Sequence, residues 1–288
     1  MLDAVRARAF LLLQYMLPKH FITAIVYRLT RIRLRSFKNL LIRAFAKTYG
    51  VDTDEAADAV PEGYADFNAF FTRSLKPGSR PVAAEAVVSP VDGTVSAAGD
   101  IQERQLLQAK GRYYELADLL ASDIDDATAY DGGKFATIYL APHNYHRVHC
   151  PVDAQLRRAR YVPGDLFSVN VATVSLLPEL FARNERLIMH FDTARGPMML
   201  LFVGALNVGS ITTNWTGEIR PVRRGVVQDL TLDPDAQRAQ IKKGELLGWF
   251  NMGSTVILLF PRNRVTWDAG LAAGNTLRMG EAIGRELA

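Results

Sequence analysis

The run Thr255–Phe260 constrains the fold of this chain more than any other stretch. It is apolar and rich in β-branched residues, and Gly253 and Ser254 stand directly before it. A run of this kind bounded by glycine is typical of a buried strand entered through a turn. Glycine permits backbone torsions and close approaches that other residues disfavour, so a serine at such a turn can be presented as a nucleophile. The simpler interpretation, in which the two residues only turn the chain, stays open.

A nucleophilic serine needs a base, and the sequence offers candidates before Ser254. Asp92 is one possible partner, although Asp92–Gly93 is also a common hairpin-turn dipeptide. Three histidines follow at regular intervals: His143, His146 and His149. Serine, histidine and aspartate need only meet in space, so chain order is no obstacle to a catalytic triad.

The spacing of the histidines limits what they can do together. Residues three apart on a regular strand point to opposite faces, so the backbone must turn before His146 and His149 can face one cavity. We expect a turn over Pro142–Tyr145 that leads into a strand from Arg147. No Asp, Glu or Cys at ligand spacing completes a zinc site, so no metal is expected. The single cysteine, Cys150, excludes an intrachain disulfide and is expected to be a small buried thiol.

The charge of the chain is concentrated at its N-terminus. Residues 1–50 carry ten Lys or Arg and one acid, a balance of +9, whereas the whole chain has a net charge of +4. The remaining residues therefore carry 4 − 9 = −5. Such local basicity speaks against a general nucleic-acid-binding protein, and no nucleic-acid partner is expected.

The basic N-terminal segment has a helical pattern from Phe21 to Lys47. Apolar residues recur at helical spacing, and cations lie along another face: Arg28, Arg31, Arg35, Lys38 and Arg43. Such a helix can pack on the protein's own core, but the lopsided charge favours an anionic membrane surface. The apolar run Ala9–Leu17 is too short for a transmembrane helix and lacks the cleavage site of a signal peptide, so neither is expected.

The rest of the chain changes from helical to β signals near residue 80. Asp66 can cap a short helix before Pro77–Gly78, and short helices are also expected within 113–122 and 174–183. The strand-like runs are Val87–Val88, Thr94–Val95, Phe135–Leu140, Arg147–Val152, Met198–Val203 and Thr255–Phe260. The predicted class is α+β, with amphipathic helices in residues 1–80 that associate with a membrane and a β-rich domain in residues 81–288.

Several short motifs occur together and in order along nearly the whole chain. They are Phe67–Lys76 (FNAFFTRSLK), Pro90–Gly93 (PVDG), Gln108–Gly111 (QAKG), Tyr145–His149 (YHRVH), Gly164–Asn170 (GDLFSVN), Phe181–Arg186 (FARNER) and Gly253–Thr255 (GST). In these motifs the chain closely resembles the bacterial phosphatidylserine decarboxylase proenzymes, pyruvoyl enzymes that make phosphatidylethanolamine. One departure is Met252, where members of that family commonly carry leucine.

The resemblance implies a compact barrel or sandwich core akin to lipoyl-type domains and a chain that cuts itself. His149, oriented by Asp92, would take the proton from Ser254. The hydroxyl would then attack the carbonyl carbon of Gly253 and convert the amide to an ester. Elimination and hydrolysis would leave a pyruvoyl group on residue 254 and divide the zymogen into residues 1–253 and a fragment of 288 − 253 = 35 residues.

The same resemblance implies that the covalent pyruvoyl group is the cofactor, without pyridoxal phosphate and without metal. It would form a Schiff base with the amine of phosphatidylserine and accept the electrons released when carbon dioxide leaves. His146 is the candidate proton donor to the former α-carbon. Phe167 and Ser168 are candidate substrate contacts, although a turn leading into a helix explains them equally well. Lys110 can meet a phosphate or simply stay solvated.

The implied partners are phosphatidylserine and an anionic membrane surface. The two fragments of the chain would form a heterodimer, and a dimer of such heterodimers is possible. The expected location is the cytoplasmic side of the cell (inner) membrane, as a peripheral protein. Three alternatives remain on the sequence. They are a pyruvoyl decarboxylase of a soluble amino acid, a membrane-surface serine hydrolase with Ser254 intact, and a non-catalytic lipoyl-like domain.

Overall fold

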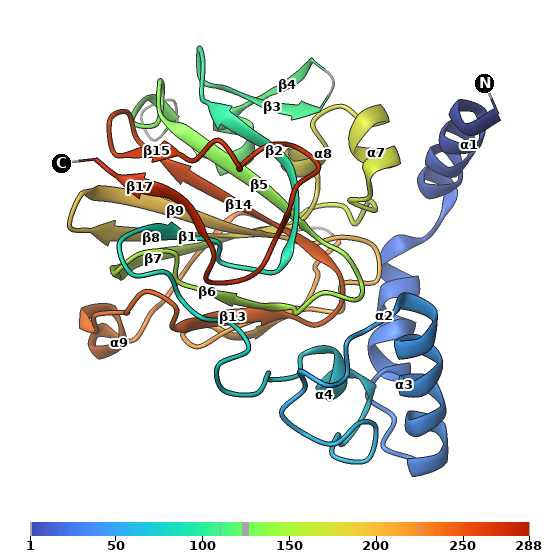
Figure 1. Cartoon of the computed structure of the whole chain (residues 1–288). Helices are drawn as coiled ribbons and strands as arrows, with labels where there is room; N and C mark the ends of the chain where they lie inside the picture. Colours follow the sequence, from blue (N-terminus) through green and yellow to red (C-terminus); the bar gives the residue numbers. More distant parts are fainter. Residues whose placement is uncertain (1, 110, 123–126, 224, 288) are drawn as a thin grey trace.

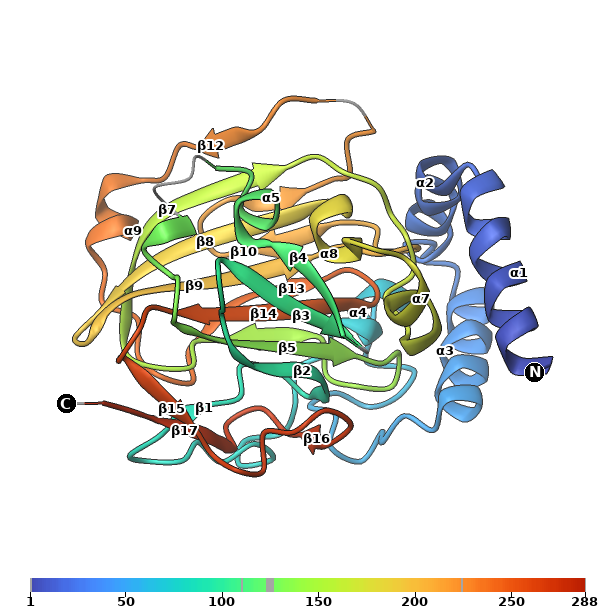
Figure 2. The ribbon, with the colours of Figure 1, turned by 90° about the horizontal axis from the view of Figure 1, so that it is seen from above.

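The protein has a helical part at one end and a β-rich part that makes up most of the molecule (Figure 1 and Figure 2). This computed structural model describes residues 2–109, 111–122, 127–223 and 225–287. The first three helices stand together on the right of both views, and the chain then crosses below the sheets before the first strand begins. The α+β class predicted from the sequence is confirmed.

Three helices form the N-terminal part: α1 (Leu2–Met16), α2 (Lys19–Leu29) and α3 (Arg35–Tyr49). The continuous pattern expected from residue 21 to residue 47 is therefore interrupted between α2 and α3. The interruption has a tertiary cause, because the carbonyl of Thr30 accepts the backbone N–H of Asn68 from a distant segment. The left-handed torsions of Gly50, with φ of 65°, end α3 as expected.

No single helix of the described residues is long and apolar enough to cross a membrane. The segments Arg6–Met16 and Lys19–Leu29 pass the same test only as a pair, by length and composition, and they are bent by 86° at their junction.

A short helix connects the helical part to the sheets. It is α4 (Phe67–Phe71), and the Asp66 carboxylate accepts the N–H of Ala69 at 2.9 Å, as expected of an N-cap. The ring of Phe45 in α3 lies 5.0 Å from the ring of Phe67 and 5.9 Å from that of Phe71. These aromatic contacts fix α4 between α3 and the β-rich part.

The largest sheet has eight strands in the order β12-β7-β8-β9-β14-β5-β2-β16. Their bounds are β12 Gln228–Leu230, β7 Ala154–Val162, β8 Arg186–Thr193, β9 Gly196–Val203, β14 Ser254–Phe260, β5 Lys134–Leu140, β2 Gly93–Asp100 and β16 Thr276–Leu277. The apolar run Thr255–Phe260 belongs to β14, which lies inside this sheet and pairs with both β9 and β5. Every residue of β14 is buried, as an apolar run between two neighbours requires.

Smaller sheets complete the β-rich part. The four-stranded sheet has the order β11-β10-β13-β6, and the three-stranded sheet has the order β1-β17-β15. Their bounds are β11 Gly217–Ile219, β10 Ile211–Thr213, β13 Leu246–Phe250, β6 Arg147–His149, β1 Val87–Val88, β17 Ala282–Glu286 and β15 Val265–Trp267. The hairpin of β3 (Gln105–Ala109) and β4 (Arg112–Glu115) stands apart, and the remaining helices are α5 Leu116–Leu120, α7 Val171–Leu176, α8 Leu180–Arg183 and α9 Pro234–Arg238.

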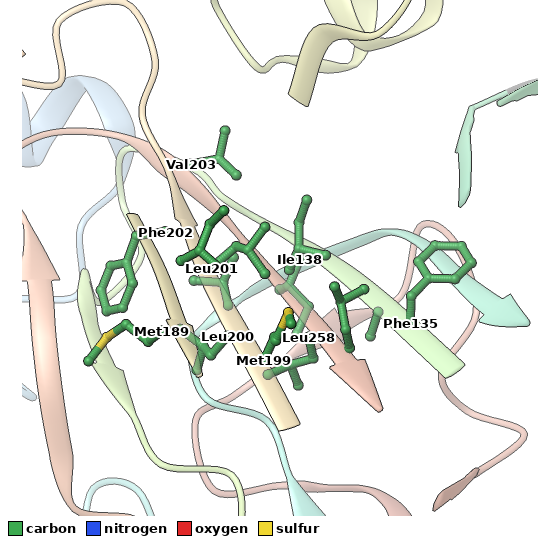
Figure 3. Packing of buried hydrophobic residues seen from close by; sticks show 14 of the residues in the cluster. Phe135, Ile138, Met189, Met199, Leu200, Leu201, Phe202, Val203 and Leu258 are labelled. Carbon is green, nitrogen blue, oxygen red and sulfur yellow. The ribbon is translucent and has the colours of Figure 1, made fainter. Parts of the chain in front are cut away.

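The core lies on both faces of the eight-stranded sheet. Figure 3 shows apolar side chains of successive residues such as Leu200, Leu201 and Phe202 packed in it, and all three are fully buried. Phe202 of β9 meets Phe250 of β13 with ring centroids 5.1 Å apart. The face that carries Phe202 therefore packs against the four-stranded sheet. Val256 of β14 pairs with Phe202 and so projects from the same face.

Several expectations need correction. The largest sheet begins and ends in strands that do not pair with each other in the described part of the chain, so the barrel alternative is wrong. The expected strand Arg147–Val152 ends at His149, because Pro151 has no N–H to continue a ladder. The expected helix over 113–122 is half strand, since residues 112–115 pair with β3. The lipoyl-type likeness stays a prediction.

Candidate active site

The site is built around the turn that joins β13 to β14. Met252 in this turn has φ of 110°, a value that is strained for any residue but glycine. Gly253 follows, and a side chain there would meet no atom within 4 Å, so the backbone at this peptide is open. The Ser254 hydroxyl is buried and has no hydrogen-bond partner among the described residues. The turn therefore presents a buried hydroxyl, without a partner among the described residues, two positions after a strained residue.

Asn251 anchors the start of this turn. Its side-chain amide donates to the hydroxyls of Ser210 and Thr212, both at 2.8 Å, and its Oδ1 accepts from Asn68 at 2.9 Å. Its backbone N–H donates to the Ser210 carbonyl at 2.9 Å. The residue was not singled out from the sequence, because its partners lie far away in the chain. It joins α4, the four-stranded sheet and the turn at one point.

His146 lies on the other side of the turn. As predicted, residues 142–145 form a turn and β6 begins at Arg147. The His146 carbonyl accepts the N–H of Phe250 at 3.1 Å, and its ring packs on Phe71 with centroids 4.0 Å apart. Nδ1 bonds the carbonyl of Asn144 at 2.8 Å, while Nε2 is buried without a described partner. Complete burial lowers the pKa of His146 to about 3, so the ring is neutral at physiological pH.

His149 is oriented differently from the expectation. Its Nε2 contacts the hydroxyl of Tyr145 at 3.0 Å, and its Nδ1 contacts the carbonyl of Gly244 at 2.8 Å. Both ring nitrogens are thus engaged, and Asp92 is not the group that orients the imidazole. Burial lowers the pKa of His149, which keeps it neutral and able to accept a proton. Tyr145 belongs to a motif quoted from the sequence, but nothing in that motif indicated its role.

Asp92 is held by other partners. Arg80 Nη2 lies 2.6 Å from Oδ2, and the backbone N–H of Met279 donates to Oδ1 at 2.8 Å. The loop around Asp92 still lies beside His149, because the His149 N–H donates to the Pro90 carbonyl at 2.9 Å. Asp92 is therefore close enough to influence the imidazole electrostatically, while its hydrogen bonds link the loop to the C-terminal segment.

The loop that holds Phe167 and Ser168 is fixed from two sides. The Asn184 side chain donates to the carbonyls of Phe167 and Gly204, both at 2.8 Å. The Ser168 N–H donates to Gln14 of α1 at 2.8 Å. Gly204 follows β9, so this loop lies between the end of the large sheet and the first helix. The contact of Phe167 and Ser168 with substrate stays a prediction. Lys110, the candidate phosphate contact, lies outside the described residues.

The five cations expected at a membrane do not behave alike. Lys38 is only 7% exposed, and its ammonium donates to the carbonyl of Pro61 at 3.2 Å, so it does not present its charge to a surface. Arg31 pairs with Glu218 at 2.8 Å, and Arg43 pairs with Glu62 at 2.9 Å. Arg28 and Arg35 are exposed. The set predicted from helical spacing is therefore wrong for Lys38, because a loop covers that face of α3.

The helical part exposes an unusual amount of apolar side chain. Met16 is 83% exposed and Leu12 66% exposed, and further large apolar residues of the first three helices and of the segment between α2 and α3 are uncovered. These are Phe10, Leu13, Tyr15, Phe21, Ile25, Leu29, Ile32, Leu34, Leu40 and Tyr49. A concentration of exposed large apolar residues in one part of a chain is typical of a site of association with a membrane or another protein.

Two other features bear on the chemistry available to the site. Cys150 is free and fully buried, as expected, and burial raises the pKa of its thiol to about 12, so it is not a reactive thiolate. Within the described ranges, no group of three or more His, Cys, Asp or Glu side chains is arranged to hold a metal ion.

Fold and site together define an α+β protein in which a buried serine begins an interior strand, and in which two neutral, buried histidines lie on the segment that pairs with the preceding strand, β13. The family model described as phosphatidylserine decarboxylase matches residues 67–285, and a model described as PSD matches residues 9–50. Three relatives are phosphatidylserine decarboxylase proenzymes. The protein of Methylococcus capsulatus is 48% identical over 98% of both chains. That of Delftia acidovorans is 49% identical over 88% of this chain and 89% of its own. That of Azotobacter vinelandii is 45% identical over 98% of this chain and 99% of its own. The chain belongs to the phosphatidylserine decarboxylase family.

Proposed function

We propose that this chain is a zymogen that cuts itself between Gly253 and Ser254 and then converts phosphatidylserine to phosphatidylethanolamine and carbon dioxide. The observation that carries the proposal is the buried hydroxyl of Ser254, two residues after the strained Met252 and without a hydrogen-bond partner among the described residues, in a member of this family. A buried hydroxyl without a partner costs free energy, and such a cost is tolerated where a reaction uses the group.

The residues present fit the formation of a pyruvoyl group from Ser254. Neutral His149 accepts the hydroxyl proton at Nε2, once the Tyr145 hydroxyl has left that nitrogen. The oxygen attacks the Gly253 carbonyl carbon, and the C–N bond breaks to leave an ester. Loss of the Cα proton breaks the ester C–O bond, which frees the Gly253 carboxylate and leaves dehydroalanine. Water then replaces its nitrogen, which departs as ammonia.

The structure also supports a stable pair of chains after the cut. The C-terminal fragment would contribute β14, whose apolar residues Val256–Phe260 are buried between β9 and β5. Burial of each such side chain contributes about 1.5–3 kcal/mol. The bond from Met279 to Asp92 also crosses between the two fragments. The fragments should therefore stay associated as a heterodimer without a covalent link.

The pyruvoyl group supplies a carbonyl that takes up the substrate amine and accepts the electrons released with carbon dioxide. His146 is the candidate for the proton transfer to the substrate. Since Nδ1 bonds the Asn144 carbonyl, the neutral ring offers Nε2 as an acceptor, and Phe71 covers the ring from water. Nε2 of His146 would take a proton that the substrate ammonium gives up when the Schiff base forms, and would pass it to the substrate carbon after carbon dioxide leaves.

We further propose that the protein works as a peripheral protein at the cytoplasmic face of the cell membrane. The exposed apolar residues of the first three helices and the exposed cations Arg28 and Arg35 support this location. The same helices contact the turn before Ser254 through α4. A lipid substrate gives a reason for this surface, whereas a soluble amino acid does not.

The division of labour between the histidines is tested by single substitutions. His149→Ala should leave most of the chain uncut, because the base that activates Ser254 is lost. His146→Ala should be cut but should lose decarboxylation of phosphatidylserine presented in detergent micelles. Gel analysis gives the cut fraction, and released carbon dioxide gives the activity. Equal loss of cutting in both variants would contradict the assignment.

A further inference from the structure

Glu185 is a buried acid that the proposed mechanism does not use. Its carboxyl is almost completely buried, and Oε2 accepts the hydroxyl of Tyr161 at 2.9 Å. Oε1 is buried and has no partner in the described part of the chain. Glu185 was quoted from the sequence only within the motif of residues 181–186, where no chemistry was assigned to it. An orphaned carboxyl oxygen in an interior calls for a partner.

The strand register places Glu185 in line with Ser254. Val203 of β9 pairs with Arg186 on one side and with Thr255 on the other. The next position along β9 is Gly204, whose N–H donates to the Glu185 carbonyl at 2.9 Å. Continuing the same register by one residue sets Gly204 opposite Ser254. Residues opposite one another in a sheet project from the same face, so Glu185 and Ser254 share one face with only Gly204 between them.

Gly204 makes room for the carboxyl between those two residues. A Cβ at position 204 would lie 2.6 Å from Cγ of Glu185 and 2.7 Å from its Oε1. The acid therefore occupies the space that a side chain at 204 would fill. Oε1 of Glu185 and Oγ of Ser254 are both buried without a partner among the described residues, and the register sets the two residues on one face with no side chain at position 204 between them.

We propose that Glu185 is a further positioning residue of the active site, a neutral acid that holds the oxygen of residue 254 by a hydrogen bond, directly or through one water. This inference rests on the proposed function of Ser254. The bond would satisfy both orphaned oxygens and set the direction of the hydroxyl toward the Gly253 carbonyl.

The charge state of Glu185 decides whether the bond can work. Burial raises the pKa of Glu185 to about 8, so the group is protonated at neutral pH. The groups that face it carry no charge there. Tyr161 of β7, which donates its hydroxyl hydrogen bond to Glu185, has its pKa raised by burial, and Gly204 and Ser254 carry no charge. Above pH 8 the ionised carboxylate would disfavour loss of the Ser254 proton, and self-cleavage should slow.

The test follows conversion of the full chain, made by cell-free synthesis, into its two fragments between pH 6.5 and pH 9.5. The wild-type rate should fall above pH 8 by nearly tenfold per unit at its steepest. Glu185→Gln keeps a neutral side chain and should remove this fall. Glu185→Ala should be about tenfold slower at every pH, the loss expected for one hydrogen bond. Glu115→Gln, at an exposed position of β4, is the matched control and should follow the wild type.

A second pair of variants keeps the inference testable if Glu185→Ala folds poorly. Gly204→Ala should slow self-cleavage, because its Cβ displaces the carboxyl. Combined with Glu185→Gln it should stay slow, since the glutamine is displaced in the same way. Combined with Glu185→Ala it should add no further loss. Near-ultraviolet circular dichroism of each purified chain reports whether the fold is kept.

The outcomes separate this inference from the proposed function. Two results with a wild type that is cut would overturn the role of Glu185. One is a self-cleavage rate of Glu185→Gln that falls above pH 8 as the wild-type rate does. The other is self-cleavage of Glu185→Ala at the wild-type rate. If no chain is cut, including the wild type, the proposed function itself fails.

Discussion

At the scale of the residue, burial decides the chemistry of His146. The ring has lost its water, so protonation in the folded chain is costly, and Nε2 is left without a described partner. A buried histidine of this kind lowers the free energy of unfolding at acidic pH. The unfolded chain binds a proton below its ordinary pKa of about 6.5, whereas the folded chain resists protonation down to about pH 3. Stability is therefore complete above pH 6.5 and falls as the pH drops through this window.

The prediction is that His146→Gln flattens the acid side of the stability profile. The comparison is made in a Ser254→Ala background, which should stay a single chain. With His146 present, the free energy of unfolding should fall more steeply as the pH drops, by up to about 1.4 kcal/mol per pH unit, than with glutamine at this position. Urea denaturation between pH 4 and pH 7 measures it. His143→Gln, at an exposed position, is the control. An unchanged slope for His146→Gln would contradict the neutral, buried state.

The sequence located the chemical residues but not their contacts. Ser254, His146 and His149 could be singled out because glycine, serine and histidine leave visible patterns. The orientation of His149 by Tyr145 and Gly244 could not, since the second partner lies 95 residues away along the chain. Asp92 was expected to bond the imidazole because that pairing is common, and the neighbouring Arg80 takes its carboxylate instead.

At the scale of the element, the turn between β13 and β14 depends on α4. Asn68 reaches from α4 to Asn251, and Phe71 covers His146. The strained Met252 packs against the aromatic cluster that includes Phe67 and Phe71. A strained residue persists only where its surroundings over-determine it, and these contacts supply that constraint. Part of the motif at residues 67–76 therefore lies against the turn that presents Ser254.

Removing the anchor of the turn should slow self-cleavage. Asn251→Ala loses the hydrogen bonds to Ser210, Thr212 and Asn68, so the turn should relax. We expect cutting to slow by about tenfold or more and stability to fall by about 2–3 kcal/mol. Conversion in cell-free synthesis and urea denaturation of a Ser254→Ala version measure the two effects. Asn275→Ala, in an exposed loop, should leave both unchanged, and a normal cutting rate for Asn251→Ala would refute this account of the turn.

Some elements could be predicted and others could not, for a physical reason. Strands β5, β9 and β14 are apolar runs buried on both faces, and such runs are visible in sequence. The break between α2 and α3 carries neither proline nor glycine and depends on a contact with Asn68, so it was missed. Strand β7 was also missed, since its mixture of arginine and apolar residues hides the strand pattern.

At the scale of the whole molecule, the helical part carries the proposed membrane surface and also contacts the candidate active site. Its exposed apolar residues face away from the protein core, while α4 connects the same part to the turn before Ser254. Such an arrangement would bring the site to the surface where a lipid substrate lies.

Polar substitution of this surface should weaken membrane binding without stopping self-cleavage. A triple variant, Leu12→Ser with Met16→Ser and Phe21→Ser, should bind phosphatidylglycerol-containing vesicles at least tenfold more weakly, because it removes exposed apolar side chains. Co-sedimentation with vesicles gives the affinity. The double variant Val171→Ser with Val226→Ser removes exposed valines outside the first three helices and should bind normally. Equal binding by all three proteins would exclude the helical surface as the membrane contact.

The most direct measurement is the intact mass of freshly purified protein, with its fragments resolved. The account predicts two chains that stay together until denatured, one covering residues 1–253 and one covering residues 254–288. The smaller chain should be lighter by one ammonia than the same fragment beginning with serine. Ser254→Ala should give one chain. A wild-type protein recovered as a single chain of 288 residues with Ser254 intact would contradict self-processing and favour a serine hydrolase or a non-catalytic domain.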